Sequence, residues 1–259
     1  MQVLSGITKS KFFVSSCQLH EIGDNLFKKY RELGKIPETD KEILILSSFL
    51  KSHKTHGAIL LLCEKGYGED SIILCRSILE IYIQMKYILT DTSDERITRY
   101  VDYDWVLRKN LFENLKERKE LSDIPEERII EINEKAKNFL VKYNRGNPKF
   151  NPRTWSDKNN REMAQEIHEI GLYQFYSSMC TFSHSTSRSL NEFNTNYTKQ
   201  DNHELISEKY INLALCFAID CHKKTCLEFN KMFFGGFEDQ LSSIEPEIPV
   251  IINDSKSTD

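Results

Sequence analysis

Two separated segments carry side chains suited to binding an anion and moving a proton. The first is GEDSIILCRSILEIYIQMKYIL, which is almost entirely apolar apart from Arg76 and Glu80 near its middle. Residues four apart on a helix share a face and can form an ion pair. A charge in such a helix is costly unless it is paired and hydrogen-bonded. The pair is therefore either a buried ion pair that fixes helix register or an arginine, held by Glu80, that binds a phosphate.

The second segment is LYQFYSSMCTFSHSTS, in which Tyr173, Ser177, Cys180 and His184 fall on one helix face. The dipole at a helix C-terminus stabilises a protonated imidazole there. His184 is therefore either a capping residue or a general acid and base. Ser177 and His184 lie seven residues apart, roughly 10 Å along a helix, which is too far for a direct nucleophile–base hydrogen bond.

Packing of these two helices against each other would line one polar pocket. We expect Arg76 to bind phosphate there and Glu80 to orient the guanidinium. His184 would act as the general acid and base, with Tyr173 and Ser177 assisting. These five residues form the predicted catalytic set.

The sequence predicts no metal ion and no other cofactor. His53 and His56 are three residues apart and could form half of a metal site. No carboxylate or cysteine completes that helix face, which Lys51 and Lys54 flank instead. His222, in the segment CHKKTC, is expected at the surface.

The seven cysteines do not suggest a secreted disulfide framework, because their number is odd and most of them lie in apolar helical pattern. Cys216, Cys221 and Cys226 are spaced by five residues. Each step turns about 140° on a helix, so the three face different ways and cannot share a metal ion. We expect buried thiols in a reducing cytoplasm.

The elements that must position these side chains are helical. Glycine and proline together make up 16 of 259 residues, about half the average share. Periodicity and capping residues predict about eight helices, near residues 10–33, 40–65, 69–90, 94–121, 125–143, 159–170, 172–185 and 203–233. We expect one all-α domain over residues 1–236, a bundle with the apolar third helix at its centre. The tail, 237–259, is expected to be partly disordered, and Trp155 should pin the loop 144–158 rather than cover the pocket.

Charge and hydropathy give no sign of a strongly basic nucleic-acid-binding protein and argue against a membrane-spanning or secreted one. The net charge of −4 provides no global basic field for nucleic acid. No apolar run reaches the roughly 18 residues that span a membrane, and the N-terminal segment lacks the apolar stretch of a signal peptide.

Taken together, Arg76-Ser77-Ile78-Leu79-Glu80, Trp155 and the segment from Tyr173 to His184 resemble a bacterial family known only as a domain of unknown function. The resemblance covers about residues 45–230. It implies an all-helical bundle like those of HEPN nucleotide-binding proteins, sometimes in mobile-element or phage-defence surroundings. Because such bundles commonly pair, it also implies a homodimer. Arg161 and His168 have a spacing similar to the Arg–His motif of HEPN ribonucleases, although Glu162 replaces the usual Asn, Asp or His.

The function expected is processing of nucleic acid or nucleotides, as a metal-independent ribonuclease effector in phage defence or a toxin system. The alternatives are a non-catalytic helical adaptor or assembly subunit and a small-ligand sensor, each within a defence complex. The expected partners are a second copy of the chain, an RNA or nucleotide ligand, and a protein encoded in a defence operon. No membrane partner is expected.

Overall fold

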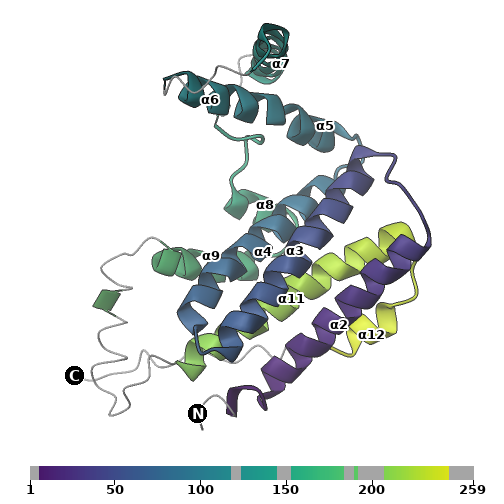
Figure 1. The fold of residues 1–259 in the computed structure, drawn as a ribbon, viewed down its shortest axis with the longest axis vertical. Coiled ribbons are helices and arrows are strands. Elements are labelled where there is room, and N and C mark those ends of the chain that lie inside the picture. Colours follow the sequence, from purple (N-terminus) through teal and green to yellow (C-terminus); the bar gives the residue numbers. More distant parts are fainter. Residues whose placement is uncertain (1–5, 118–123, 145–152, 184–189, 192–206, 245–259) are drawn as a thin grey trace. The chain divides into compact units, whose positions relative to one another are not determined.

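The computed structural model describes residues 6–117, 124–144, 153–183, 190–191 and 207–244, which form helices joined by turns (Figure 1). The helices discussed below are α2 (Lys11–Glu32), α3 (Asp40–Glu64), α4 (Gly68–Leu89), α5 (Glu95–Asp102), α6 (Asp104–Glu117), α7 (Glu126–Asn144), α8 (Asn160–Glu166), α9 (Ile170–Ser183), α11 (Glu208–Phe233) and α12 (Glu238–Ser242). No strand occurs in the described ranges. The predicted all-α class is confirmed.

Local capping explains why α3 begins and ends where the sequence predicts. The Thr39 side chain accepts a hydrogen bond from the Glu42 backbone N–H, and the Glu42 side chain accepts one from the Thr39 backbone N–H. This reciprocal capping box satisfies two of the free N–H groups at the helix start. At the other end, Gly66 has a φ of 90° and turns the chain toward α4.

Among the differences from the predicted bounds, two have a clear structural reason. The segment expected as one helix over 94–121 is divided into α5 and α6 at Tyr103. The Tyr103 ring is buried and packs against Phe139 of α7, with ring centroids 5.5 Å apart. The helix expected over 159–170 ends at Glu166, because His168 adopts a left-handed backbone conformation with a φ of 60°.

Contacts divide the chain into two compact units, residues 1–85 with 168–259 and residues 86–167. The boundary falls inside α4, between Met85 and Lys86. The single domain over 1–236 stays a prediction.

The first unit is built around α11, which packs along α3 and α2 (Figure 1). The rings of Phe49 and Phe229 stack 4.0 Å apart between α3 and α11. The α4 side chains of Ile78 and Ile83 are fully buried, as its apolar sequence predicts. Gly68 opens α4 close to α11, where an added Cβ would lie only 2.7 Å from the backbone nitrogen of Ile211. The short helix α12, in the expected tail, packs against α2 and α11.

In the second unit, α5, α6 and α7 pack against one another. Trp155 is buried, and its ring contacts those of Tyr87 and Tyr100 at centroid distances of 5.9 and 5.3 Å. Trp155 therefore holds the described part of its loop, residues 153–158, against this unit, as predicted; residues 145–152 lie outside the described residues.

All seven cysteines are free thiols, and Cys63, Cys75, Cys216, Cys221 and Cys226 are buried. Burial raises the pKa of the Cys63 thiol to about 11, so it is protonated and unreactive near neutral pH. None of the helices in the described ranges has both the length and the apolar character needed to cross a membrane.

Candidate metal centre

The predicted contact between α4 and α9 is present in part. The Arg76 Nε donates a hydrogen bond to Glu80 Oε1 at 3.2 Å, so the expected ion pair forms. From α9, Tyr176 reaches this pair, and its hydroxyl donates to Glu80 Oε1 at 2.6 Å. Tyr173 lies beside it, with its ring stacked on that of Tyr176 at 5.3 Å.

The ion pair is half-buried, with 26% of the Arg76 side chain and 32% of the Glu80 side chain exposed. Burial raises the pKa of Tyr176 to about 12, as does its hydrogen bond to Glu80, so the hydroxyl is a donor at neutral pH. Of the predicted set, the structure pairs Arg76 with Glu80, and Tyr173 is connected to that pair through the ring of Tyr176. The Ser177 side chain and the whole of His184 lie outside the described residues.

The hydrogen bond from Tyr176 gives a first prediction. Replacing Tyr176 by Phe removes a donor from a half-buried carboxylate, and the free energy of unfolding should fall by about 1–2 kcal/mol. Tyr173→Phe, one turn away, is the matched control and should change stability by less than about 0.5 kcal/mol. Urea unfolding measures both variants. If Tyr176→Phe and wild type had the same free energy of unfolding, the hydrogen bond from Tyr176 to Glu80 would not contribute to stability.

A denser polar cluster lies within the first unit, where α2, α3 and α11 meet. It contains four of the chain's seven histidines: His20 from α2, His53 and His56 from α3, and His222 from α11. The rings of His20 and His53 stack 4.1 Å apart, and those of His56 and His222 stack 4.7 Å apart. We call these four residues the histidine cluster.

Two glycines make room for this cluster. A Cβ on Gly23 of α2 would lie 2.6 Å from His53 Nδ1, and a Cβ on Gly57 of α3 would lie 3.0 Å from His20 Cε1. Each imidazole therefore occupies space left free by a glycine on the facing helix. Glycine inside a helix is less stable than alanine by roughly 0.5–1 kcal/mol, so close approach is the physical reason for these two positions.

A chain of hydrogen bonds runs inward from the surface through His53. Asp24 Oδ1 accepts from His53 Nε2 at 3.0 Å. His53 Nδ1 lies 3.3 Å from His222 Nε2, and His222 Nδ1 lies 2.9 Å from Ser52 Oγ. The chain connects α2, α3 and α11 through side chains alone.

A second, similar chain starts at His20. His20 Nδ1 lies 3.3 Å from His56 Nδ1, and His56 Nε2 lies 2.8 Å from Ser16 Oγ. Both chains therefore pass from a partly exposed histidine to a fully buried histidine and then to a buried serine.

Burial keeps the inner imidazoles neutral. The pKa values of His56 and His222 lie well below the ordinary 6.5, first because both side chains are fully buried and then because other histidines surround them. Burial also lowers the pKa of His20, an effect that His53 reinforces and Asp24 opposes.

These shifts predict acid sensitivity. Below pH 6.5 the unfolded chain binds protons at His56 and His222 that the folded chain takes up only at lower pH. The stabilising contribution is therefore complete above pH 6.5 and is lost as the pH falls. The slope should reach at most about 2.7 kcal/mol per pH unit for two protons. His20, His53 and Asp24 are charged or titratable groups that face this pair.

Urea unfolding between pH 8 and pH 5 measures the effect. His56→Gln should flatten the slope, because one of the two buried groups is removed. An equal free energy of unfolding at pH 7.5 and pH 5.5 in wild type would show that the inner histidines do not resist protonation.

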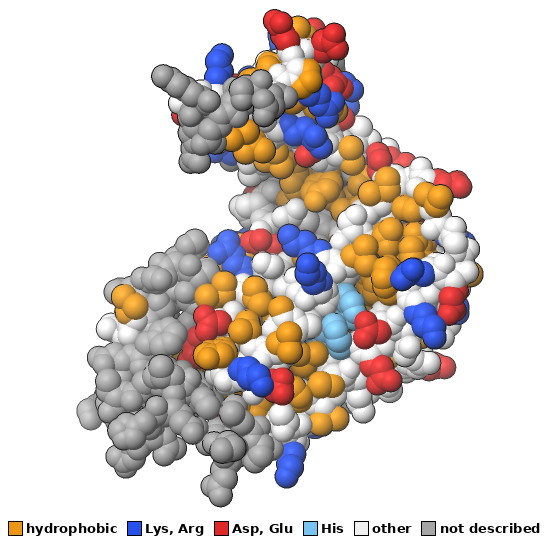
Figure 2. Space-filling model, viewed as in Figure 1, with side chains coloured by type: hydrophobic (Ala, Val, Ile, Leu, Met, Phe, Trp, Pro, Cys, Tyr) orange, Lys and Arg blue, Asp and Glu red, His pale blue; other side chains and the backbone are white. Residues whose placement is uncertain are grey.

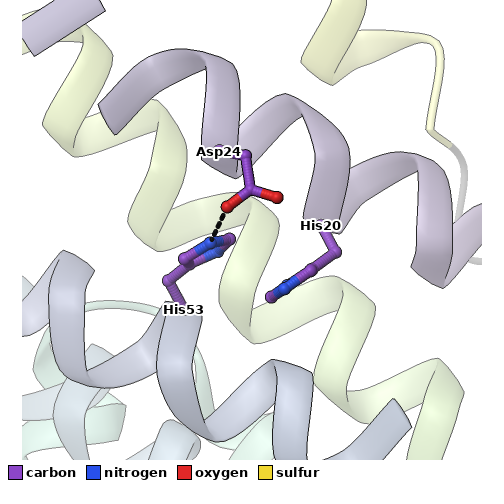
Figure 3. Close-up of side chains that lie close together, drawn as sticks. All are labelled: His20, Asp24 and His53. Carbon is purple, nitrogen blue, oxygen red and sulfur yellow. Dashed lines mark hydrogen bonds and ion pairs between the residues drawn. The ribbon is translucent and has the colours of Figure 1, made fainter. Parts of the chain in front are cut away.

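At the outer end of the cluster, the side chains of His20, Asp24 and His53 lie close enough together to be candidate metal ligands (Figure 3). One potential ligand atom from each lies within 4.8 Å of the others. The Asp24 side chain is 68% exposed and that of His53 is 14% exposed, so the group opens to solvent. Figure 2 shows histidine side chains at the surface beside acidic ones.

Such a group can hold a first-row transition ion. Zinc binds imidazole nitrogen and carboxylate oxygen at about 2.0–2.2 Å. The rings of His20 and His53, stacked with an interplanar angle of 15°, must therefore turn toward each other to place their nitrogens on one ion. Three protein ligands leave at least one position for water, which is typical of catalytic rather than structural zinc. In the described part of the chain no other set of three such residues is grouped this way.

Sequence reasoning missed this site because its ligands come from two helices. His20 and Asp24 are four residues apart and share a face of α2, and that spacing was the available signal. The expectation that His222 lies at the surface is wrong: it is fully buried, since α11 packs against α3 at this point. Arg161 and His168 are both exposed, and their joint role stays a prediction.

A family model described as "Family of unknown function (DUF5677)" matches residues 42–204. Neither a curated protein nor a solved structure matches the chain. The matched range contains His53, Arg76 and Glu80, whereas His20, Asp24 and His222 fall outside it. The match agrees with the resemblance stated from the sequence, and the likeness to HEPN bundles stays a prediction.

Proposed function

Because the chain belongs to DUF5677, a family of unknown function, we propose its function from the site alone: it is a metal-dependent hydrolase. A divalent transition ion would bind at His20, Asp24 and His53. The observation that carries this proposal is the grouping of two imidazoles and one carboxylate within 4.8 Å at the solvent-facing end of the histidine cluster.

The donor set favours Zn²⁺ and its neighbours over Mg²⁺ or Ca²⁺. Imidazole nitrogen suits zinc, cobalt and iron, whereas the two hard cations prefer oxygen ligands alone. A bound zinc ion lowers the pKa of its water to near 7 and so supplies a nucleophile at neutral pH. The residues of this chain would hold the ion, orient it and leave one side open to substrate.

The surface beside the site suggests an anionic substrate. A hollow of about 400 Å³ on α2 is lined by Asp24, Phe27, Lys28, Arg31 and Glu32. Lys28 and Arg31 lie one and two turns from Asp24 on this helix. Their cations suit the phosphate of a phosphodiester, in line with the expected nucleic acid or nucleotide.

Titration of metal-free protein with Co²⁺, followed by its visible absorption, tests the metal site. Wild type should bind one ion, and His53→Ala and Asp24→Asn should lose that binding. His168→Asn, which changes an exposed histidine outside the cluster, is the control and should bind as wild type does. Failure of wild type to bind the ion would refute the metal site.

Hydrolysis of bis(p-nitrophenyl) phosphate tests the chemistry. Zn²⁺-loaded wild type should release p-nitrophenol, and His53→Ala and a chelator should each abolish the release. An ion bound at the site without any hydrolysis of this diester or of RNA would refute the hydrolase while leaving the metal site intact.

A second candidate is the metal-independent ribonuclease predicted from the sequence. The contact of Tyr176 with Glu80 favours it, because it places α9 beside the half-buried Arg76. RNA integrity during expression of wild type, Arg76→Ala and His184→Ala tests this candidate. RNA cleavage that survives chelation and is lost in both variants would support it over the metal-dependent route.

The expected associations remain proposals. A homodimer should appear at twice the 30.4 kDa chain mass in light scattering. Cytoplasmic location and a partner from a defence operon follow from the sequence expectations. If both hydrolytic candidates fail, pull-down and mass spectrometry of bound small molecules test the adaptor and sensor roles.

A further inference from the structure

Each inner histidine of the cluster is hydrogen-bonded to one outer histidine, His222 to His53 and His56 to His20. The direction of the bonds that lead inward from Asp24 follows from which atoms can donate. Without a metal ion, the Asp24 carboxylate only accepts, so His53 carries its hydrogen on Nε2. The neutral ring then accepts at Nδ1, and His222 must donate from Nε2. His222 Nδ1 in turn accepts from the Ser52 hydroxyl.

A metal ion on His53 Nε2 would reverse the direction of both hydrogen bonds further inward in this chain. The neutral His53 ring then carries its hydrogen on Nδ1 and donates to His222 Nε2. His222 must carry its own hydrogen on Nδ1, from which it donates to Ser52 Oγ. Each ring holds one hydrogen before and after. The hydrogen on His53 Nε2 leaves to water, the hydrogen on His222 Nε2 passes to His53 Nδ1, and a proton from water restores the hydrogen of His222 at Nδ1, while Ser52 keeps its own hydroxyl hydrogen.

The second chain fits the same arrangement. His56 already occupies Nδ1 of His20, which leaves Nε2 of His20 as the ligating nitrogen. The metal-bound ring would donate from Nδ1 to His56 Nδ1, and His56 would donate from Nε2 to Ser16 Oγ. Both serines lie at the inner ends, and both are buried.

We propose that His222 and His56 are positioning residues of the metal centre, which hold His53 and His20 in the ligating orientation, and that His222 switches tautomer when the ion binds. This inference rests on the proposed metal site. Histidine ligands commonly donate their second N–H to a partner that fixes ring orientation, and loss of that partner typically weakens metal binding about 10–100-fold. Here the partners are buried imidazoles. The Cys226 thiol, 3.5 Å from His222 Nε2, is a weaker hydrogen-bonding group.

Three variants of His222 separate the contacts. Gln places a polar atom near the position of Nε2 and retains a partner for His53, whereas Asn mimics Nδ1 and retains only the partner for Ser52. Leu retains neither. We expect Zn²⁺ affinity to fall about 10–100-fold in His222→Asn and His222→Leu and to stay within about threefold of wild type in His222→Gln. Circular dichroism and thermal melts identify any variant that fails to fold.

Nitrogen-15 NMR of the histidine rings reports the tautomer of His222 directly. If His222 only stabilised the fold, its tautomer would not change when the ion binds. On addition of Zn²⁺ to wild type, His222 should change from the Nε2–H to the Nδ1–H tautomer. Zn²⁺ binding with an unchanged His222 tautomer, or with equal affinity in the Gln, Asn and Leu variants, would overturn the inference and leave the metal site standing. Absence of Zn²⁺ binding in wild type would instead refute the proposed function and, with it, this inference.

Discussion

Zn²⁺ is expected to raise the melting temperature of the metal-free protein. An ion that binds the folded chain alone stabilises it by about 2.7 kcal/mol at a concentration 100-fold above the dissociation constant. For a chain of this size that corresponds to a rise in Tm of about 5–10 °C. Differential scanning calorimetry with and without the ion measures the shift.

The variants show where the ion acts. His20→Ala, Asp24→Asn and His53→Ala should each lose most of the shift, whereas Tyr173→Phe should keep it. Mg²⁺ at the same concentration should have little effect, since it prefers oxygen ligands. A Zn²⁺ shift that persists in all three ligand variants would place the ion elsewhere on the chain.

Gly23→Ala should damage the site without touching a ligand. The new Cβ would lie 2.6 and 2.7 Å from Nδ1 and Cε1 of His53, so the ring must move. The ring is held on one side by Asp24 and stacked on Phe49 with centroids 5.7 Å apart, which makes displacement costly. We expect overpacking of about 1–3 kcal/mol, partly offset by about 1 kcal/mol of helix propensity, and a Zn²⁺ affinity at least about tenfold weaker.

Two controls separate the clash from a general effect of alanine. Gly171→Ala, in α9, meets no atom within 4 Å and should be neutral or slightly stabilising. In a His53→Ala background the ring is absent, so Gly23→Ala should no longer destabilise. Equal losses of stability from Gly23→Ala with and without the His53 ring would show that the two residues do not compete for space.

Local signals made the helices predictable. The bounds of α2, α3 and α4 follow from capping residues, a glycine after the helix end and apolar periodicity, all of which act within a few residues. The pairing of Arg76 with Glu80 is local in the same sense. The division at Tyr103 was not visible, because it depends on the packing of that ring against Phe139, 36 positions further along the chain.

The histidine cluster was not predictable for the same reason. The sequence places His53 and His56 on the same helix, α3. The residues that complete the cluster come from other helices, His20 and Asp24 from α2 and His222 from α11. The sequence likewise gave no means of choosing Tyr176 over Tyr173 as the partner of Glu80. That choice depends on how α9 is rotated against α4.

Anomalous X-ray diffraction from crystals grown with Zn²⁺ tests the central claim most directly. We predict a peak at the zinc absorption edge about 2.0–2.2 Å from a nitrogen of His20, a nitrogen of His53 and an oxygen of Asp24. The peak should be absent in crystals of His53→Ala. An ordered crystal with saturating Zn²⁺ and no peak between these three side chains would contradict the metal centre.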